Sequence, residues 1–473
     1  MKSIVFCAVI LGCLHIVGPD LLFASEEYTI SAAHGPYFAC DRRVVEDRWN
    51  LERFVVQPKR HPQNPLVTRD QPWEGTGPHM GGSVLYDPED NLFRMWYSVW
   101  NKHAYYNNLP FSYNVCYAES EDGIIWRKPP LGVFDYEGST KNNCVRLGTD
   151  KTQNIDVCLN PKRDTYPGKF LAIHNQKGGV FVSSSEDGKT FEFLWETPAI
   201  SYHSDTHNNF VYDPTRDRWL LFCRSRAWAG DHRRRVAVQE SPDLQKWTHE
   251  RVILIPTENE KPEFYGMGVF RRGDLFFGIL QIYDRETGFM HAELAWSGDG
   301  EHWDQISTHP PFVERGLPGS WEAGMVLLAE SPVDVGDEMR FYYGGFPLDH
   351  NTKEENVGSI GLLTAERDRL IGVRPGPQEP GFLITRPFTP PGQSTLTVNA
   401  TIENELRAEL RTDGNKIIPG FSLEDCDPIT ESGFKQEIRW RGKTISEVPE
   451  REMRIRFQLS QSELFTFDLA GPF

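Results

Sequence analysis

The stretch Ser120-Glu121-Asp122-Gly123-Ile124-Ile125-Trp126 decides the fold, because the chain repeats its pattern. Three further copies begin at Ser185, Ser241 and Ser297, at intervals of 65, 56 and 56 residues, and a degenerate fifth copy spans 364–370. In each copy the Ser and Asp side chains can bond backbone N–H groups of a tight turn, and the aromatic residue can pack back on the hairpin. We therefore expect the aspartates of these turns to be structural and not catalytic.

A second pattern of strand, Asx-Pro turn and strand precedes the repeated turns, as in residues 84–97 and 210–223. Units of roughly 50–65 residues with four strands are typical of propeller blades. The sequence predicts an all-β chain with a five-bladed β-propeller over residues 25–386. A Pro-rich linker then leads to a β-sandwich over 393–473, in which Met453, Ile455, Phe457 and Leu459 alternate with polar residues.

Composition excludes several classes of protein. The 473 residues hold 50 Lys and Arg against 67 Asp and Glu, a net charge of −17, and the mean hydropathy is −0.50. These values exclude an integral membrane protein and a disordered chain. A nucleic-acid-binding protein needs a basic face, so we expect no nucleic-acid partner.

The N-terminus is typical of a secretory signal. Lys2 precedes an apolar stretch at 4–17, and small residues follow near Ala24. We expect a signal peptide at 1–24, a secreted or periplasmic protein, and no membrane attachment after cleavage. A buried N-terminal strand is the alternative.

Six cysteines remain after that cleavage, without CxxC spacing, so structural zinc is not expected. Cys144 with Cys158 is a local disulfide candidate, and six buried thiols are an equally good interpretation.

Acidic residues occur near the start of the innermost strand of every expected blade. Because these strand ends crowd together at one mouth of a propeller, we expect the acids to converge there. The alternative is that they only solvate the channel or bond backbone N–H groups. The acids are Asp70 and Glu74, Asp156, Asp205, Glu263 and Glu322.

Aromatic, basic and imidazole side chains accompany these acids. Aromatic faces can stack on sugar rings, and the candidates are Trp73, Tyr265 and Trp321; His79, His207 and Arg224 complete the expected substrate-binding set, which also takes in Asp70, Asp156 and Glu322. A carboxylic acid that protonates the leaving oxygen and a second carboxylate are what glycoside hydrolysis needs.

The repeated turns, the expected signal peptide and the C-terminal sandwich resemble the furanosidase-type five-bladed propellers of glycoside hydrolase families 32 and 43. The tail segments 420–428 and 454–457 are similar to those of secreted "family 32 N-terminal-like" proteins of planctomycete-type bacteria. The resemblance implies Glu74 or Asp70 as base or nucleophile, Asp205 as transition-state stabiliser and Glu263 as general acid. The invertase signature Asn-Asp-Pro-Asn-Gly is absent from the first blade.

The expected function is a secreted glycoside hydrolase that needs no cofactor and has a carbohydrate as its partner. Some relatives carry a metal on the propeller axis, and His79 and His207 are the candidates to hold a calcium ion there, but the sequence lacks a compact oxygen-ligand loop and no metal is assigned. A glycoside phosphorylase, in which His203, His207 and Arg224 would bind the phosphate, is one alternative. A non-catalytic carbohydrate-binding propeller is the other. The run Arg233-Arg234-Arg235 is interpreted as a solvated blade edge.

Overall fold

The computed structural model describes residues 35–148, 152–202, 204–205, 207–227, 230–256, 262–306, 311–390, 392–449 and 452–470. The expected signal peptide at 1–24 lies outside the described residues, so export stays a prediction. Within these ranges no helix has the length and apolar character needed to cross a membrane.

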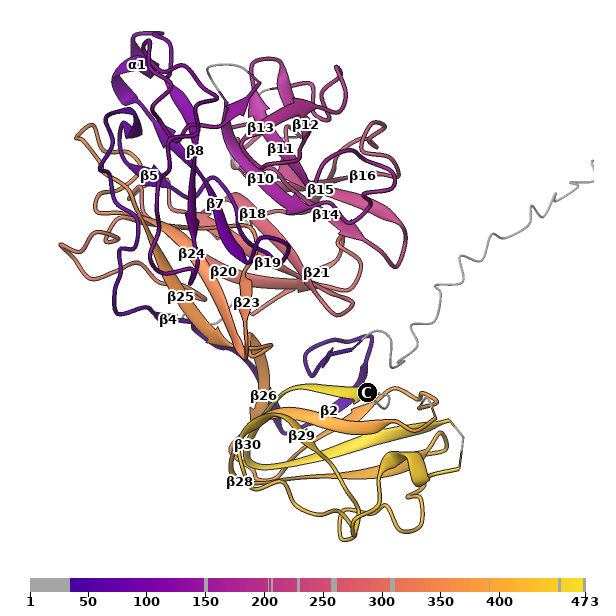
Figure 1. Ribbon diagram of the computed structural model, residues 1–473. Helices are drawn as coiled ribbons and strands as arrows, with labels where there is room; N and C mark the ends of the chain where they lie inside the picture. The colour runs from indigo at the N-terminus through magenta and orange to yellow at the C-terminus, as the bar shows by residue number, and fades with distance from the viewer. Residues whose placement is uncertain are drawn as a thin grey trace, which may run out of the picture.

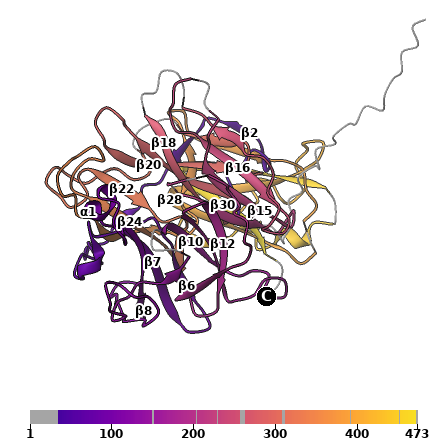
Figure 2. The same ribbon diagram turned by 90° about the horizontal axis from the view of Figure 1, so that it is seen from above.

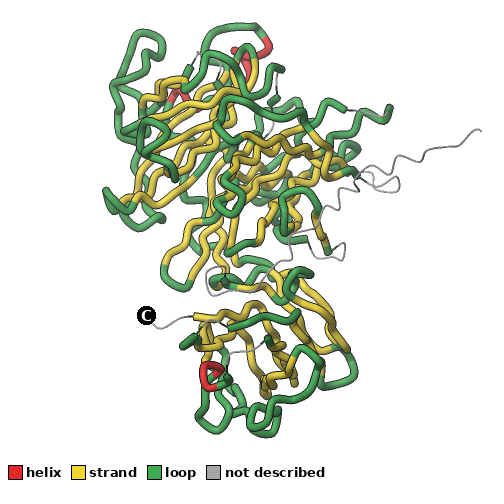
Figure 3. The backbone as a smooth tube through the Cα atoms, turned by 90° about the vertical axis from the view of Figure 1, so that its right-hand side faces the viewer, coloured by secondary structure: helices red, strands yellow, loops and turns green. Residues whose placement is uncertain are grey.

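Strands make up nearly all of the regular structure, as Figure 3 shows. The one α-helix of the described residues is α1 (Lys102–Tyr106), and the 3-10 turns are η1 (Pro72–Glu74) and η2 (Ile445–Glu447). The chain is an all-β propeller followed by a β-sandwich, as the sequence predicted. Figure 1 shows the propeller strands gathered in one body and the sandwich strands in another.

The propeller part is a succession of antiparallel units. The first holds β5 (Pro78–His79), β6 (Val84–Asp87), β7 (Leu92–Trp100) and β8 (Tyr113–Ser120). The second holds β10 (Gln153–Leu159), β11 (Phe170–Gln176), β12 (Gly179–Ser185) and β13 (Thr190–Phe193), with β9 (Arg146–Leu147) beside β13. The third holds β14 (Asn209–Asp213), β15 (Arg218–Arg224), β16 (Val236–Ser241) and β17 (Arg251–Leu254).

Two further units share a sheet through a single pair, Met290 with Met325. The fourth holds β18 (Glu263–Arg272), β19 (Leu275–Tyr283), β20 (Met290–Ser297) and β21 (Trp303–Gln305). The fifth holds β22 (Met325–Leu328), β23 (Val333–Val335), β24 (Glu338–Phe346) and β25 (Ser359–Glu366). The early strand β4 (Lys59–Arg60) pairs with β25, so the start of the chain supplies the edge of the last unit. The five units agree with the predicted five blades, although the blade count itself stays a prediction. Figure 2 shows the units from above.

The repeated turns form as the sequence predicted. Ser120 Oγ accepts a hydrogen bond from the Gly123 backbone N at 2.9 Å, and Asp122 Oδ1 accepts two from the Ile124 and Ile125 N atoms at 2.8 Å. The other three copies repeat this geometry through Asp187, Asp243 and Asp299. The degenerate fifth copy differs, because its Asp368 accepts a bond from Arg272 Nε at 2.7 Å instead.

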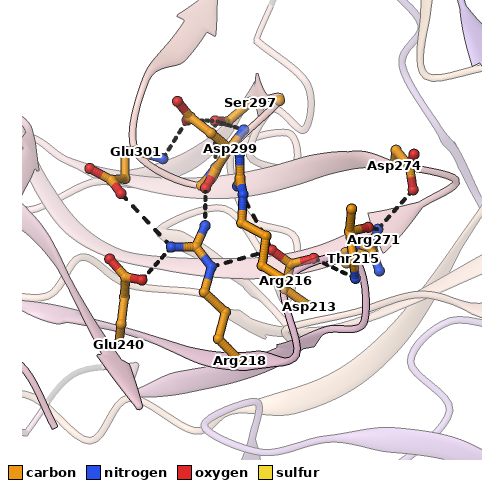
Figure 4. A network of polar contacts seen from close by, with 12 residues as sticks. Asp213, Thr215, Arg216, Arg218, Glu240, Arg271, Asp274, Ser297, Asp299 and Glu301 are labelled. Atoms are coloured by element: carbon orange, nitrogen blue, oxygen red, sulfur yellow. Dashed lines mark hydrogen bonds and ion pairs between the residues drawn. The ribbon is translucent and has the colours of Figure 1, made fainter. Parts of the chain in front are cut away.

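Arg218 of β15 ties the third unit to the fourth, as Figure 4 shows. Its Nε donates to Asp213 Oδ2 at 3.3 Å, and its Nη1 pairs with Glu240. Its Nη2 donates to the carbonyl of Asp299 at 3.0 Å, inside the repeated turn of the next unit. The turns therefore bind neighbouring units together as well as closing hairpins.

The sandwich is built on two long strands, β28 (Thr395–Thr412) and β30 (Met453–Ala470), which pair antiparallel over most of their length. The short strand β29 (Gly433–Glu437) lies beside β28. Met453, Ile455, Phe457 and Leu459 are fully buried in the core between the layers. The predicted alternation of β30 is therefore confirmed.

The strand pairing differs from the expected domain boundaries of 25–386 and 393–473. β1 (Tyr37–Phe38) and β27 (Gly381–Thr385) pair with β30. β2 (Val45–Trp49) pairs with β27, and β3 (Leu51–Val55) pairs with β26 (Ile371–Pro375). These segments belong by hydrogen bonding to the sandwich sheet. Alternation along a strand tells which face is buried but not which strand it pairs with.

The cysteines do not form the Cys144–Cys158 disulfide that the sequence suggested. All six cysteines in the described part of the chain are free. Cys144 lies beside Cys116, with the two Sγ atoms 3.6 Å apart, while Cys158 stands on β10. The correction follows from backbone pairing, because Cys116 and Cys144 face each other across a β-bridge.

Candidate functional site

A cavity of about 330 Å³ opens where the inner strands of the propeller begin. His79 on β5, His207 just before β14, Tyr265 near the start of β18 and Met325 at the start of β22 all line it. Asp205, in the loop that leads into β14, lines it as well. The structure thus brings four of the predicted site residues together at the expected mouth: His79, Asp205, His207 and Tyr265.

Asp205 is the predicted catalytic residue that reaches this cavity. Its side chain is 45% exposed, and it pairs with Arg224 from the end of β15. The backbone carbonyl of Asp205 accepts a hydrogen bond from Asn154 Nδ2 at 2.8 Å, which fixes the loop against the second unit. Asp205 is therefore a positioned carboxylate in contact with the cavity.

Tyr265 and His350 form the wall beside the guanidinium of Arg234. The rings of Tyr265 and His350 meet edge to face at 5.3 Å, and Arg234 lies over Tyr265 at 4.9 Å. Burial raises the pKa of Tyr265 to about 12. Burial, with the charge of Arg234, lowers the pKa of His350. Near neutral pH this wall therefore offers a protonated phenol, a neutral imidazole and a cation.

Glu263, the expected general acid, stands behind this wall and is fully buried. It accepts hydrogen bonds from the backbone N and Nη1 of Arg234 at 2.9 and 3.1 Å, and from Arg285 Nε at 2.5 Å. Burial favours a higher pKa for Glu263, but the bonds and charges of Arg285 and Arg234 outweigh it and the pKa is lowered. Because the ionised Glu263 carboxylate bonds both Arg234 and Arg285, it fixes the position of the Arg234 side chain beside the cavity.

Glu74 is fully buried in the first unit and does not line the cavity. Its carboxylate accepts hydrogen bonds from Tyr97 Oη at 2.8 Å and Lys128 Nζ at 2.6 Å, and it caps η1 through the N–H groups of Asp70 and Gln71. The expectation that Glu74, Asp205 and Glu263 meet in one solvent-filled pit therefore needs correction. Spacing along the chain located the strand starts but not the direction of each side chain.

The remaining predicted residues that lie outside the cavity have structural partners. Trp73 Nε1 donates to Asn143 Oδ1 at 2.6 Å, and Asp70 Oδ1 pairs with Lys128 Nζ at 2.7 Å. Glu322 pairs with Arg60 Nε at 2.6 Å, and the Trp321 ring packs on Tyr343 at 5.4 Å. Arg224 reaches the site through its ion pair with Asp205.

Several buried polar side chains lie at the cavity or next to it. His207 Nδ1 lies 3.1 Å from Glu330 Oε1, and burial with the charge of Glu330 raises the pKa of Asp156 to about 8. Burial lowers the pKa of His79 to about 4, so its imidazole is neutral near pH 7. No group of three or more His, Cys, Asp or Glu side chains in the described ranges is arranged to hold a metal ion. The axial calcium stays a prediction.

Several residues that line the cavity were not predicted from the sequence. The Trp-Asn-Lys-His-Ala-Tyr-Tyr segment at the end of β7 was the missed signal, because it places many aromatic residues in an insertion between two strands. Arg234 was interpreted as part of a solvated edge, but it turns inward while its neighbours Arg233 and Arg235 pair with Asp231. The missed aromatic, imidazole and charged residues are Trp100, Lys102, Tyr105, Tyr106, Tyr113, Arg234, His350 and Glu354.

Comparisons with known proteins give a weak likeness in fold. No model of a protein family matches the chain, and no curated protein matches it. Among solved structures, an N-acetylgalactosamine deacetylase from F. plautii shows 16% identity over 72% of this chain and 95% of its own, with a TM-score of 0.42.

Two other structures give similar values. The catalytic domain of an α-L-arabinofuranosidase from Coprinopsis cinerea shows 13% identity and a TM-score of 0.45, covering 66% of this chain and 96% of its own. A β-1,2-mannobiose phosphorylase from Listeria innocua shows 14% identity and a TM-score of 0.47, covering 66% and 97%. Likeness at this level carries no argument about activity, which rests on the cavity.

Proposed function

We propose that the protein is an exported carbohydrate-active enzyme that hydrolyses glycosidic bonds at the propeller mouth. The observation that carries the proposal is the cavity of about 330 Å³ in which a positioned carboxylate, Asp205, faces aromatic and imidazole side chains. A concave site with aromatic walls and a few convergent polar groups is where a small-molecule or sugar substrate binds. The signal peptide at 1–24 belongs to the same proposal.

Hydrolysis needs two carboxyl groups near the scissile bond. In the described residues, Asp205 and Glu354 are the two that line the cavity. We assign to Glu354 the proton transfer to the leaving oxygen, and to Asp205 the role of the carboxylate that takes a proton from the attacking water as the water bonds to the anomeric carbon. The backbone carbonyl of Glu354 accepts a bond from Lys102 Nζ at 3.0 Å, which holds this loop against the first unit.

Phosphorolysis is a second candidate, and Arg234 is the observation that favours it. A phosphorylase needs one proton donor beside a cationic pocket for phosphate. Arg234 lines the cavity, and the paired arginines at Glu263 outnumber that carboxylate by one positive charge. The group that replaces water would then be phosphate held at Arg234.

The test is turnover of a panel of α- and β-furanosides, pyranosides and oligosaccharides, with and without phosphate. We expect sugar release without phosphate, and Asp205→Asn and Glu354→Gln should each reduce it by roughly 10²–10⁴. Glu121→Gln is the matched control, because this carboxylate is 83% exposed and remote from the cavity.

The outcomes separate the alternatives. Strict dependence of turnover on phosphate would replace hydrolysis by phosphorolysis. Binding of sugars without turnover by the wild-type protein would leave a carbohydrate-binding propeller. Equal activity of Asp205→Asn and Glu121→Gln would remove the cavity as the reactive site.

A further inference from the structure

Four aromatic side chains line the outer side of the cavity, and we call them the aromatic platform: Trp100, Tyr105, Tyr106 and Tyr113. Neighbouring ring centroids lie 5.3 Å apart for Tyr105 and Tyr106 and 5.6 Å apart for Tyr105 and Tyr113. The Tyr106 residue is 70% exposed and the Tyr105 residue 49%. Adjacent exposed aromatic rings at the edge of a cavity are a feature of binding surfaces.

The platform is held in place before any ligand arrives. Asn101 caps α1 by accepting a hydrogen bond from the Ala104 backbone N at 3.0 Å. Lys102 Nζ donates to the carbonyls of Lys353 and Glu354 at 2.9 and 3.0 Å, which ties the helix to the loop across the cavity. Such pre-organisation lowers the entropy cost of binding.

Tyr113 connects the platform to the reactive centre. Burial raises its pKa, and the charges of Tyr105, Asp205 and Tyr265 raise it further. Tyr113 lines the same cavity as Asp205, and its ring also contacts the Tyr105 ring of the platform. The Trp100 and Tyr113 rings are stacked with 16° between their planes. The platform rings are thus in continuous contact from Tyr113 through Tyr105 to Tyr106, on the lining of the cavity that Asp205 shares.

We propose that the aromatic platform is a subsite for a second sugar ring, so that the substrate is an oligosaccharide or polysaccharide chain. One ring lies in the cavity at Asp205, and the next stacks its apolar face on Tyr105 and Tyr106 while its hydroxyl groups remain in solvent. This inference rests on the proposed function and adds a substrate class to it.

The experiment compares binding of a length series, from monosaccharide to hexasaccharide, of whichever sugars the panel identifies. Binding is measured by calorimetry to Asp205→Asn protein, which keeps the ligand intact. We expect affinity to rise from monosaccharide to disaccharide, and the added change Tyr105→Ala with Tyr106→Ala to remove about tenfold or more of that gain. Trp49→Ala is the control, because Trp49 is 54% exposed on β2 of the sandwich.

Each result has a definite meaning. An equal loss for monosaccharide and longer sugars, or no loss, would overturn the platform as a second-ring subsite. Self-association of the wild-type protein that the platform variant abolishes, with sugar affinity unchanged, would identify a protein interface instead. Length-dependent binding that needs the platform, in a protein without turnover, would support the subsite while the enzymatic proposal fails.

Discussion

Asp156 is a buried carboxyl between three units of the propeller. Its Oδ2 accepts hydrogen bonds from Asn209 Nδ2 at 2.8 Å and the Phe210 backbone N at 3.0 Å, and its Oδ1 accepts from Ser83 Oγ at 3.0 Å. Three donors normally favour the ionised form. Burial and the nearby Glu330 outweigh them and raise the pKa of Asp156 to about 8. The native protein therefore keeps this group protonated near neutral pH.

We predict that Asp156→Asn flattens the pH dependence of stability. The folded-state pKa lies above the unfolded value of about 4, so the folded protein binds more protons between about pH 4 and pH 8. The contribution of Asp156 is thus complete below that window and is lost as pH rises through it, with a slope of up to about 1.4 kcal/mol per pH unit. Denaturant unfolding of wild type and variant from pH 4 to pH 9 measures the difference.

The pH series contains its own control. Near pH 9 the two proteins should differ little in slope, since Asp156 is then mostly ionised in both the folded and the unfolded state. Parallel stability curves across the whole range would show that Asp156 titrates as an exposed carboxyl does.

Within the repeated turn, glycine is required for two separable reasons. Gly188 has φ of 72°, and a Cβ there would lie 2.8 Å from Trp96 Cζ2. Its carbonyl also accepts a hydrogen bond from Trp96 Nε1 at 2.7 Å, so this turn fits closely against the neighbouring unit. Gly132 has φ of 75°, but a Cβ added there would meet no atom within 4 Å.

We predict that Gly188→Ala destabilises the protein more than Gly132→Ala. Both changes carry the cost of a left-handed residue, about 1–2 kcal/mol. Gly188→Ala adds overpacking against Trp96, about 1–3 kcal/mol more. Thermal unfolding of the two variants gives the difference directly, and equal melting temperatures would show that the Trp96 ring moves aside at no cost.

At the scale of elements, sequence reasoning succeeded where the pattern is local. The Ser-x-Asp turns and the alternation of β30 depend on residues within a few positions of each other, and both form as predicted. Sequence reasoning failed where residues far apart in the chain determine the direction of a side chain. Glu263 begins β18 and Glu74 ends η1, shortly before β5, but Arg285 and Lys128, from other parts of the chain, hold their carboxylates away from the cavity. Of the acids predicted from the sequence, Asp205, which lies on an irregular loop, is the one that lines the cavity.

The pairing of β1–β3 with β26, β27 and β30 joins the first and last strands of the described residues in one sheet. This arrangement was beyond the sequence pattern, because short strands such as Tyr37–Phe38 carry no periodicity. It links the propeller to the sandwich at both ends of the propeller segment. Contacts at this junction should therefore affect the cooperativity of the whole molecule.

Arg369 is a buried side chain that crosses this junction. It follows β25 of the propeller, and its Nε donates to Asn399 Oδ1 at 2.7 Å on β28 of the sandwich. Nη1 donates to Thr401 Oγ1 at 3.2 Å, and Nη2 donates to the carbonyl of Ala400 at 3.1 Å. Only 8% of Arg369 is exposed. Arg369 also pairs with Glu366 Oε2 at 2.5 Å, at the end of β25, so groups of both bodies hold this buried guanidinium in position.

We predict that Arg369→Met lowers stability by about 2–4 kcal/mol and separates the unfolding of the sandwich from that of the propeller, because it leaves Asn399 and Thr401 without their charged donor. Calorimetry should show one transition for wild type and two for the variant. Arg374→Met is the matched control: Arg374 is 47% exposed and pairs with Glu52 at 2.6 Å, so its loss should cost less than about 1 kcal/mol. If the two variants unfold alike, the coupling resides in the shared sheet and not in Arg369.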